Sequence, residues 1–276
     1  MTLTMERTRT GKAVQPVKLG VEKLLEGQYK DLGGLRVGLV CNQASVDHGY
    51  SHVADLFFHH PDIDLKALFG PQHGIRGDVQ DNMIETDHAT DRITGLPVYS
   101  LYSETREPTE QMLRDIDVIV FDMQDVGCRI YTFVYTMLHV LQACAAARLP
   151  LVVLDRPNPL GGAVVDGNVL DPEYRSFVGL HPLAVRHGMT VGELALLFAR
   201  ELELDMYLRV VRMKGLRREM HFEDTGLPWV LPSPNMPTVD TAFVYPGGCL
   251  IEGTNLSEGR GTTRPFELVG APWLDP

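Results

Sequence analysis

The sequence predicts an α/β protein with a doubly wound, mostly parallel sheet, followed by the beginning of a smaller α+β domain. First, short apolar runs typical of buried strands alternate with segments whose apolar residues recur at helical spacing. Second, three of these runs end directly in polar motifs, as strands do at the sheet edge where ligands bind. Third, the composition changes after residue 213, where Pro, Gly and Thr become frequent.

The elements of the first half of the α/β domain follow from these patterns. Residues 17–25 and 52–60 have apolar side chains at helical spacing and predict helices. The apolar runs 35–40 and 65–69 predict strands, the second of which stops at Gly70-Pro71. Residues 71–97 predict a long loop, and a loop of this length inside a compact domain usually has a function.

The second half of the domain repeats the alternation. Residues 108–116 predict a short helix that begins with proline, and residues 117–121 a fully buried strand. A buried helix follows over residues 132–147, and then a strand over residues 149–154. The last helix begins with a capping box, Thr190 to Glu193, and residues 208–213 predict the last strand.

We expect three regions along the chain. They are a ragged polar leader (1–15), the α/β catalytic domain (16–213) and the start of a C-terminal domain (214–276). The sequence stops at Pro276 without a closing helix or strand, so we expect this second domain to be incomplete.

Composition excludes several classes of protein. The chain has 36 acidic and 25 basic residues, a formal net charge of −11, which argues against a nucleic-acid-binding surface. No apolar run is long enough to span a membrane, and residues 1–9 contain no apolar signal segment. The four cysteines are widely spaced without a CxxC motif, so we expect reduced thiols and a cytoplasmic protein with no structural zinc site.

Polar clusters at the ends of three strands predict a binding site at one edge of the sheet. The clusters are Gln72 and His73, then Asp122, Gln124 and Asp125, then Asp155, Arg156 and Asn158. No strand is followed by a GxGxxG or GxxxxGK[ST] loop, so a dinucleotide or P-loop site has no support.

Four arginines lie inside motif loops, where a guanidinium suits an anionic substrate group or an internal pair with a neighbouring aspartate. They are Arg76, Arg129, Arg156 and Arg260. The carboxylates suited to acid–base catalysis are Glu85, Asp122, Asp125, Asp155, Glu252 and Glu258. Asp122-x-x-Asp125 after a buried strand also leaves open a Mg²⁺-dependent phosphatase, although those enzymes usually have D-x-D.

Six motifs, in order, resemble the NamZ-type exo-β-N-acetylmuramidases, a family formerly classed as a domain of unknown function. The motifs are residues 69–77 (FGPQHGIRG), 94–101 (TGLPVYSL), 121–132 (FDMQDVGCRIYT), 154–162 (LDRPNPLGG), 232–237 (PSPNMP) and 252–267 (EGTNLSEGRGTTRPFE). The resemblance implies a Rossmann-like catalytic domain followed by a smaller C-terminal domain, with the site in the cleft between them. It also implies removal of a non-reducing terminal N-acetylmuramic acid from peptidoglycan fragments, without a metal or organic cofactor.

One departure from the family pattern concerns the first motif. The family commonly has glutamate where this chain has Gln72, and an amide cannot exchange a catalytic proton as a carboxyl group can. We therefore expect Glu85 to be the principal acid or base, Asp125 the second carboxylate and Glu252 the third.

The partner that we expect is a muramic-acid-containing sugar or muropeptide, whose lactyl carboxylate the arginines would hold. The expected substrate-binding residues are Gln72, His73, Arg76, Asp122, Arg129, Tyr131, Asp155, Arg156, Asn158, Asn255 and Arg260. A second hypothesis is a muropeptide-binding protein of the same fold without turnover. The phosphatase is a third.

Overall fold

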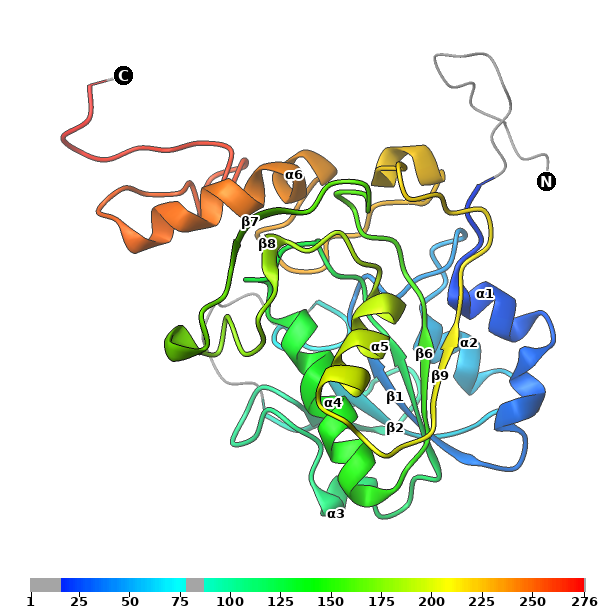
Figure 1. Ribbon diagram of the computed structural model, residues 1–276. Helices are drawn as coiled ribbons and strands as arrows, with labels where there is room; N and C mark the ends of the chain where they lie inside the picture. The colour runs from blue at the N-terminus through cyan, green and yellow to red at the C-terminus, as the bar shows by residue number, and fades with distance from the viewer. Residues whose placement is uncertain (1–15, 78–86, 276) are drawn as a thin grey trace.

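Seven strands form one sheet at the centre of the molecule (Figure 1). The structure, a computed structural model, describes residues 16–77 and 87–275. In spatial order the strands are β3 (Ala89–Thr90), β4 (Pro97–Ser100), β2 (Asp64–Gly70), β1 (Arg36–Cys41), β5 (Val118–Asp122), β6 (Leu151–Leu154) and β9 (Leu208–Val211).

All pairs in this sheet are parallel except β3 with β4. When the six parallel strands are numbered in chain order, their spatial order is 3-2-1-4-5-6, which is the Rossmann order. The strand order therefore confirms the predicted doubly wound α/β fold. The order reverses between β1 and β5, and in such sheets ligands usually bind in the crevice outside this switch point.

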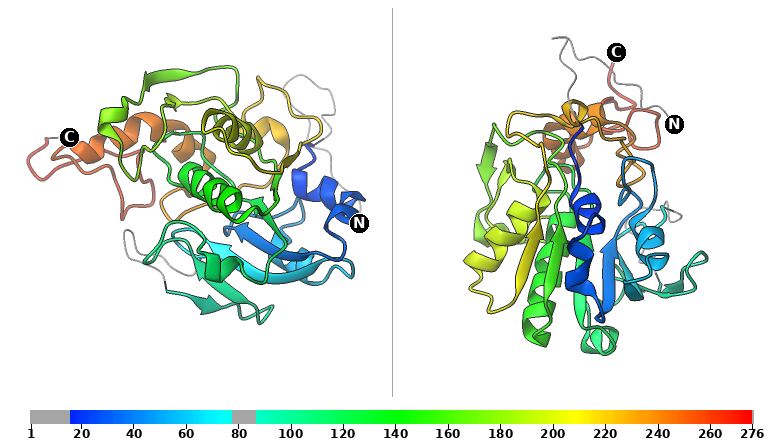
Figure 2. Two further views of the ribbon diagram at one scale, coloured as in Figure 1. Left: turned by 60° about the horizontal axis from the view of Figure 1, so that its bottom comes forward. Right: turned by 90° about the vertical axis from the view of Figure 1, so that its right-hand side faces the viewer.

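Helices cover both faces of the sheet (Figure 2). On one face, α1 (Gly20–Leu25) and α2 (Val53–Phe58) pack on side chains such as Leu39 and Val120. On the other face, α3 (Glu110–Leu113), α4 (Phe133–Ala147) and α5 (Val191–Glu201) pack on side chains such as Phe121 and Val153. Consecutive strand residues point to opposite faces, so strands covered on both sides are largely apolar: β6 is apolar throughout, and β5 is apolar up to its last residue, Asp122.

The predicted capping box begins α5. The Thr190 hydroxyl accepts a hydrogen bond from the Glu193 amide at 3.3 Å, and the Glu193 carboxylate accepts one from the Thr190 amide at 3.0 Å. These bonds satisfy backbone donors that the first turn leaves without helical partners.

Several elements had no counterpart in the sequence prediction. A separate antiparallel hairpin pairs β7 (Asp166–Val169) with β8 (Ala184–Arg186), and β3 is a two-residue edge strand. Short 3₁₀ helices are η1 (Gln28–Leu32), η2 (Pro172–Tyr174), η3 (Phe222–Thr225) and η4 (Cys249–Gly253). Within the described ranges, no helix has the length and apolar character needed to cross a membrane.

The C-terminal segment, residues 236–275, lies over the end of the sheet at which the parallel strands finish (Figure 1). It contains α6 (Val239–Gly248) and η4. Its buried side chains Tyr245, Cys249 and Phe266 join the same apolar cluster as Tyr131 and Phe133. The segment is thus packed against the body of the protein beside the start of α4. The domain boundary after residue 213 stays a prediction.

Candidate active site

A cleft of about 450 Å³ lies between the carboxyl edge of the sheet and the C-terminal segment. Its walls come from the loop after β2, the start of α4 and the segment that contains α6 and η4. Five of the predicted site residues line it: Gln72, His73, Tyr131, Glu252 and Arg260. The volume falls in the range of small-molecule sites, and the lining combines aromatic rings with a few polar groups, as such sites do.

His73 holds an unusual backbone conformation in the loop after β2. Its φ angle is 74°, in the left-handed region that residues with a Cβ atom seldom adopt, and the side chain is buried. This conformation costs about 1 kcal/mol or more, and strain of this kind is concentrated at functional sites. It fixes the loop that carries Gln72 into the cleft wall.

Tyr131 places a hydroxyl group deep in the wall of the cleft. Its ring makes edge-to-face contacts with Phe133 and Tyr245, with centroids 4.8 and 5.9 Å apart. Among the described residues the buried hydroxyl has no hydrogen bond of normal geometry. Burial raises the pKa of Tyr131, and the nearby Ser233 hydroxyl only partly offsets this. The phenol therefore stays protonated and is a donor for a bound ligand.

Arg260 lies between two carboxylates at the opposite wall. Its Nη2 is 2.8 Å from Glu252 Oε1 and its Nη1 is 3.2 Å from Glu258 Oε1. The guanidinium carbon also lies 5.1 Å from the centroid of the Phe266 ring. Glu252 and Arg260 thus give the cleft one negative and one positive group that are already paired.

Asp125 lies outside the lining of the cleft, buried against a histidine that the sequence prediction missed. Asp125 Oδ2 accepts a hydrogen bond from the Gly127 amide at 2.7 Å and lies 3.5 Å from His187 Nε2. His187 Nδ1 accepts from the Met189 amide at 3.2 Å, so the ring proton is on Nε2, facing the carboxylate. No spacing rule connects residues 125 and 187, because the contact is made across the β7–β8 region.

Asp122 and Arg156 form a buried ion pair at the switch point of the sheet. Asp122 Oδ1 accepts from Arg156 Nε, and Oδ2 lies 3.1 Å from Nη2. Arg156 Nη2 also donates to the Val46 carbonyl at 3.0 Å. Both side chains are almost fully buried, so the groups that the sequence places at a ligand site are occupied by one another.

Arg76 and Arg129 also have internal partners. Arg76 contacts Asp55 at 2.7 Å and Asp91 at 3.0 Å. Burial opposes charge on both partners, but the hydrogen bonds raise the pKa of Arg76 and, with those from Thr94, lower that of Asp91 to about 2. Arg129 Nη1 donates to the carbonyls of Asn168 and Leu183 and so holds the β7–β8 hairpin.

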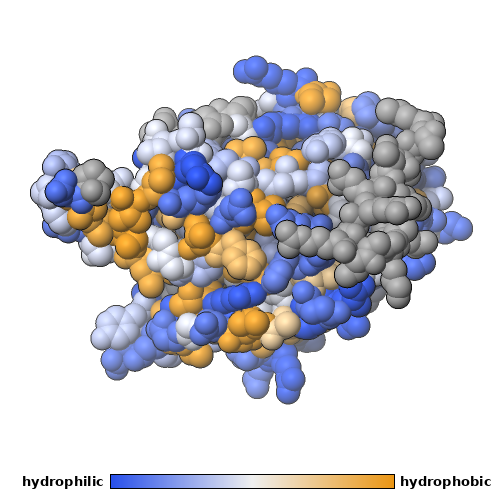
Figure 3. Space-filling view, turned by 90° about the horizontal axis from the view of Figure 1, so that it is seen from above, coloured by the Kyte–Doolittle hydropathy of each residue, from blue (hydrophilic) through white to orange (hydrophobic). Residues whose placement is uncertain are grey.

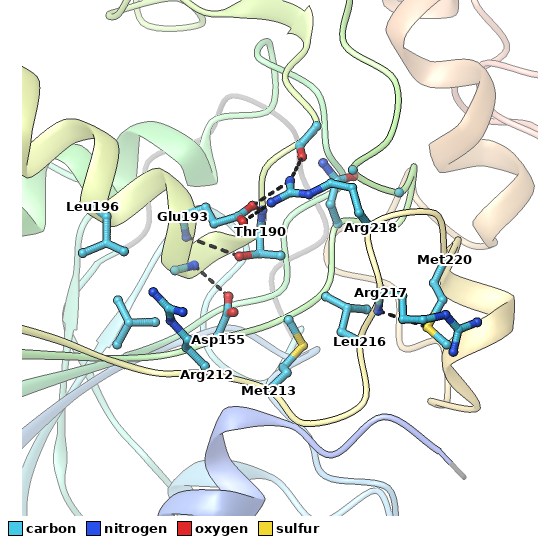
Figure 4. A pocket seen from close by; sticks show the side chains of 16 residues that line it. Asp155, Thr190, Glu193, Leu196, Arg212, Met213, Leu216, Arg217, Arg218 and Met220 are labelled. Atoms are coloured by element: carbon cyan, nitrogen blue, oxygen red, sulfur yellow. Dashed lines mark hydrogen bonds and ion pairs between the residues drawn. The ribbon is translucent and has the colours of Figure 1, made fainter. Parts of the chain in front are cut away.

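The remaining predicted residues lie elsewhere. Asp155 and Asn158 line a second cavity, of about 370 Å³, which shares no lining residue with the cleft (Figure 4). Asn255 is exposed and does not line the cleft, and Glu85 lies outside the described residues. Within residues 16–77 and 87–275, no three His, Cys, Asp or Glu side chains come together as a metal site. With Asp122 held by Arg156, the structure gives the phosphatase hypothesis no support.

Fold and site together define a class of protein: an α/β protein with the Rossmann strand order, whose cleft lies between the sheet edge and a C-terminal segment. Comparison with known families identifies one family within this class. The model for the N-terminal domain of exo-β-N-acetylmuramidase NamZ matches residues 37–240, and the model for the C-terminal domain matches residues 243–276. The chain belongs to the NamZ family.

Individual relatives agree with this assignment. The chain is 53% identical over 258 residues to the peptidoglycan β-N-acetylmuramidase NamZ of Bacillus subtilis strain 168, a match that covers 94% of this chain and 62% of that protein. Two crystal structures of DUF1343 family proteins from Bacteroides fragilis are also similar. One has a TM-score of 0.87 at 44% identity, over 94% of this chain and 66% of that one. The other has a TM-score of 0.81 at 34% identity, over 95% of this chain and 69% of that one.

Proposed function

We propose that this protein is a glycoside hydrolase that removes non-reducing terminal N-acetylmuramic acid from peptidoglycan fragments. The observation that carries the proposal is the cleft itself. The loop after β2, Tyr131 and the Glu252–Arg260 pair meet there, in a chain 53% identical to a peptidoglycan β-N-acetylmuramidase. Aromatic rings beside paired charges suit a sugar that carries a carboxylate.

The acid in this proposal comes from the loop after β2. Gln72 lines the cleft but has no proton to exchange, and Glu252 is engaged with Arg260. We therefore retain Glu85, thirteen positions further along the sequence, as the principal acid or base, with Glu252, which lines the cleft, as the second carboxylate. Asp125 would act only through the residues that cover it, since it does not line the cleft.

The test is release of N-acetylmuramic acid from a chromogenic β-muramide by the parent protein and by Glu85→Gln. General acid catalysis contributes about a hundredfold or more, so we expect a loss of at least that size. Binding of N-acetylmuramic acid, measured by calorimetry, should persist in the variant. Glu173→Gln, at an exposed position on η2, is the matched control and should keep the parent rate. Equal rates for parent and Glu85→Gln would remove Glu85 from the mechanism.

Arg260 would select the substrate. Of the four motif-loop arginines, only Arg260 lines the cleft, and it can turn from Glu252 or Glu258 toward a lactyl carboxylate. Arg260→Gln should lower kcat/KM for the β-muramide about tenfold or more, because a charged hydrogen bond is lost. It should leave kcat/KM for the matching β-N-acetylglucosaminide, which lacks the carboxylate, almost unchanged.

Arg264→Gln is the matched control for this substitution. Arg264 is an exposed neighbour that pairs with Glu267 and does not line the cleft. An equal loss on both substrates in Arg260→Gln would contradict a role in selection.

Gln72 favours a second candidate function, a muropeptide-binding protein without turnover. An amide in the cleft wall can hydrogen-bond a sugar but cannot transfer a proton. This function predicts calorimetric binding of N-acetylmuramic acid with no release of product by the parent protein over long incubation.

A further inference from the structure

The second cavity is lined by an acidic and a basic side chain that form no ion pair with each other. The cavity opens at the carboxyl ends of β6 and β9, against the first turn of α5 (Figure 4). Asp155 follows β6 and Arg212 follows β9, and both side chains line it. Its volume, about 370 Å³, is enough for a small organic molecule.

Strand register explains why these two residues are neighbours. Leu154 pairs with Val211 at the end of the two strands, and the Asp155 amide donates to the Val211 carbonyl at 3.1 Å. The next positions, 155 and 212, therefore face each other, with backbones about 5 Å apart and side chains on the same face of the sheet. Both are described residues, and no ion pair joins them.

Asp155 is fixed at the floor of the cavity. The residue is 7% exposed, and Oδ1 accepts a hydrogen bond from the Gly192 amide at 2.8 Å. Gly192 permits this contact, because a Cβ atom there would lie 2.5 Å from Val210 Cγ1. The carboxylate is thus preorganised and almost fully buried, while Arg212 is exposed at the rim.

The other charged groups around the cavity already have partners. Arg218 binds Glu193 and the Gly188 carbonyl, and Arg217 lies 2.8 Å from Glu219. Among residues 16–77 and 87–275, Arg212 has no ion-pair partner. The cavity therefore offers one buried acceptor and one available guanidinium, on adjacent strands.

We propose that this cavity is a second binding site, separate from the cleft, for a small zwitterion that carries an ammonium and a carboxylate group, such as an amino acid. The ammonium would bind the Asp155 carboxylate, and the carboxylate would bind the guanidinium of Arg212. One molecule then neutralises both groups, which no side chain in the described protein does. A free amino acid and a short peptide both carry these two groups, which in the peptide lie at opposite ends of the molecule. The proposal does not depend on hydrolysis in the cleft.

The experiment is isothermal calorimetry at pH 8 with glycine, alanine, glutamate and lysine as probes, each at up to about 10 mM. Dialanine is added as a fifth probe, and it tests whether the site prefers a peptide or a free amino acid. For whichever probe binds, the N-acetyl derivative lacks the ammonium and the amide derivative lacks the carboxylate. We expect each derivative to bind about tenfold or more weakly than its parent.

Two variants test the carboxylate-binding and the ammonium-binding residue separately. Arg212→Gln should weaken the parent probe about tenfold while leaving the amide derivative unchanged. Asp155→Asn should abolish the preference for the parent probe over the N-acetyl derivative. Arg200→Gln, which removes an exposed arginine from the far end of α5, is the matched control and should bind as the parent protein does.

Absence of binding by every probe would overturn the proposal, as would equal binding of the N-acetyl and amide derivatives. Unchanged affinity in Arg212→Gln would also overturn it. Binding that N-acetylmuramic acid displaces would place the ligand in the cleft and contradict a separate site. Release of N-acetylmuramic acid is a separate readout, so failure of this site and failure of the proposed hydrolase are distinguishable.

Discussion

At the residue scale, the arginines of the motif loops illustrate how one sequence signal has two physical outcomes. Arg76 pairs with two carboxylates, Arg156 with one carboxylate and a carbonyl, and Arg129 with two carbonyl groups, all from other strands or loops. Arg260, whose carboxylate partners lie within eight residues of it, remains at the surface of the cleft. A buried guanidinium requires partners for all its donors, so the partners decide which arginines are available to a ligand.

Asp155 makes stability depend on pH. Burial, opposed by the Gly192 hydrogen bond, raises the pKa of Asp155 to about 6 from its usual 3.8. Between these two values the folded protein holds the proton more tightly than the unfolded chain does. The free energy of unfolding therefore falls as the pH rises from about 4 to about 6, and stays lower above that.

We expect Asp155→Asn to be more stable than the parent at pH 8, by on the order of 2 kcal/mol, because the neutral amide can still accept from Gly192. At pH 4 the difference should vanish. Urea denaturation at the two pH values measures this, with the exposed substitution Asp62→Asn as control. A pH-independent difference would contradict the burial of a charge at this position.

At the element scale, α1 sits so close to the sheet that one position allows no side chain. A Cβ atom on Gly20 would lie 2.4 Å from the Asp155 amide nitrogen and 2.6 Å from the Val211 carbonyl oxygen. These are backbone atoms at the ends of β6 and β9, so the clash cannot be relieved by a rotamer change. The helix would have to move away from the strands that carry the second cavity.

Gly20→Ala should therefore lower the free energy of unfolding by about 2–4 kcal/mol, although alanine is the better helix former. Gly247, within α6, is the matched helical glycine, and nothing lies within 4 Å of a Cβ atom built there. Gly247→Ala should raise stability by up to about 1 kcal/mol. Thermal unfolding followed by circular dichroism compares the two; destabilisation of both would show that contact with β6 and β9 is not the cause.

The elements also show where sequence patterns succeed and fail. Apolar runs predict β1, β2, β5, β6 and β9 because each is covered by helices on both faces. The β7 strand, Asp166–Val169, is exposed along its whole length, so it has neither an apolar run nor alternation. Helix α6 contains Pro246 and two glycines, which normally end a helix, so the sequence did not predict it. Burial of Tyr245 and Ala242 in the core offsets the low helix propensity of these residues.

The site is less predictable than the fold for a related reason. Strand ends identify the edge of the sheet at which polar groups gather, and the sequence alone predicted that edge. Which groups pair with each other depends on contacts between distant residues, such as Asp122 with Arg156 and Asp125 with His187.

At the scale of the whole molecule, apolar side chains gather toward the end formed by the C-terminal segment (Figure 3). Leu268, Val269 and Leu274 are 47%, 48% and 46% exposed, and Trp273 is 62% exposed. Clusters of exposed apolar side chains commonly mark contact surfaces. We expect this one to drive association between copies of the chain at high concentration.

Replacing Leu268, Val269 and Leu274 with Gln, Thr and Gln should shift the protein toward monomer in sedimentation experiments at high concentration. The control makes comparable changes at Val164, Val165 and Val169, which are also exposed but lie just before β7 or within it. If both triple variants associate as the parent does, the C-terminal segment is not the contact surface. A loss of association in both would indicate non-specific hydrophobic contact instead.

The buried pair at the switch point has a consequence for the order in which the protein assembles. Arg156, just after β6, reaches Asp122, which is 34 residues away, and the Val46 carbonyl, which is 110 residues away. Loop closure over such separations costs chain entropy before any contact repays it. The ion pair with Asp122 needs only β5 and β6, whereas the hydrogen bond to Val46 also needs the turn after β1, so Arg156 has both partners only when the two halves of the sheet have met. In the second half alone, the Arg156 guanidinium has Asp122 but lacks the Val46 carbonyl, and this favours completion of the whole sheet over that half alone.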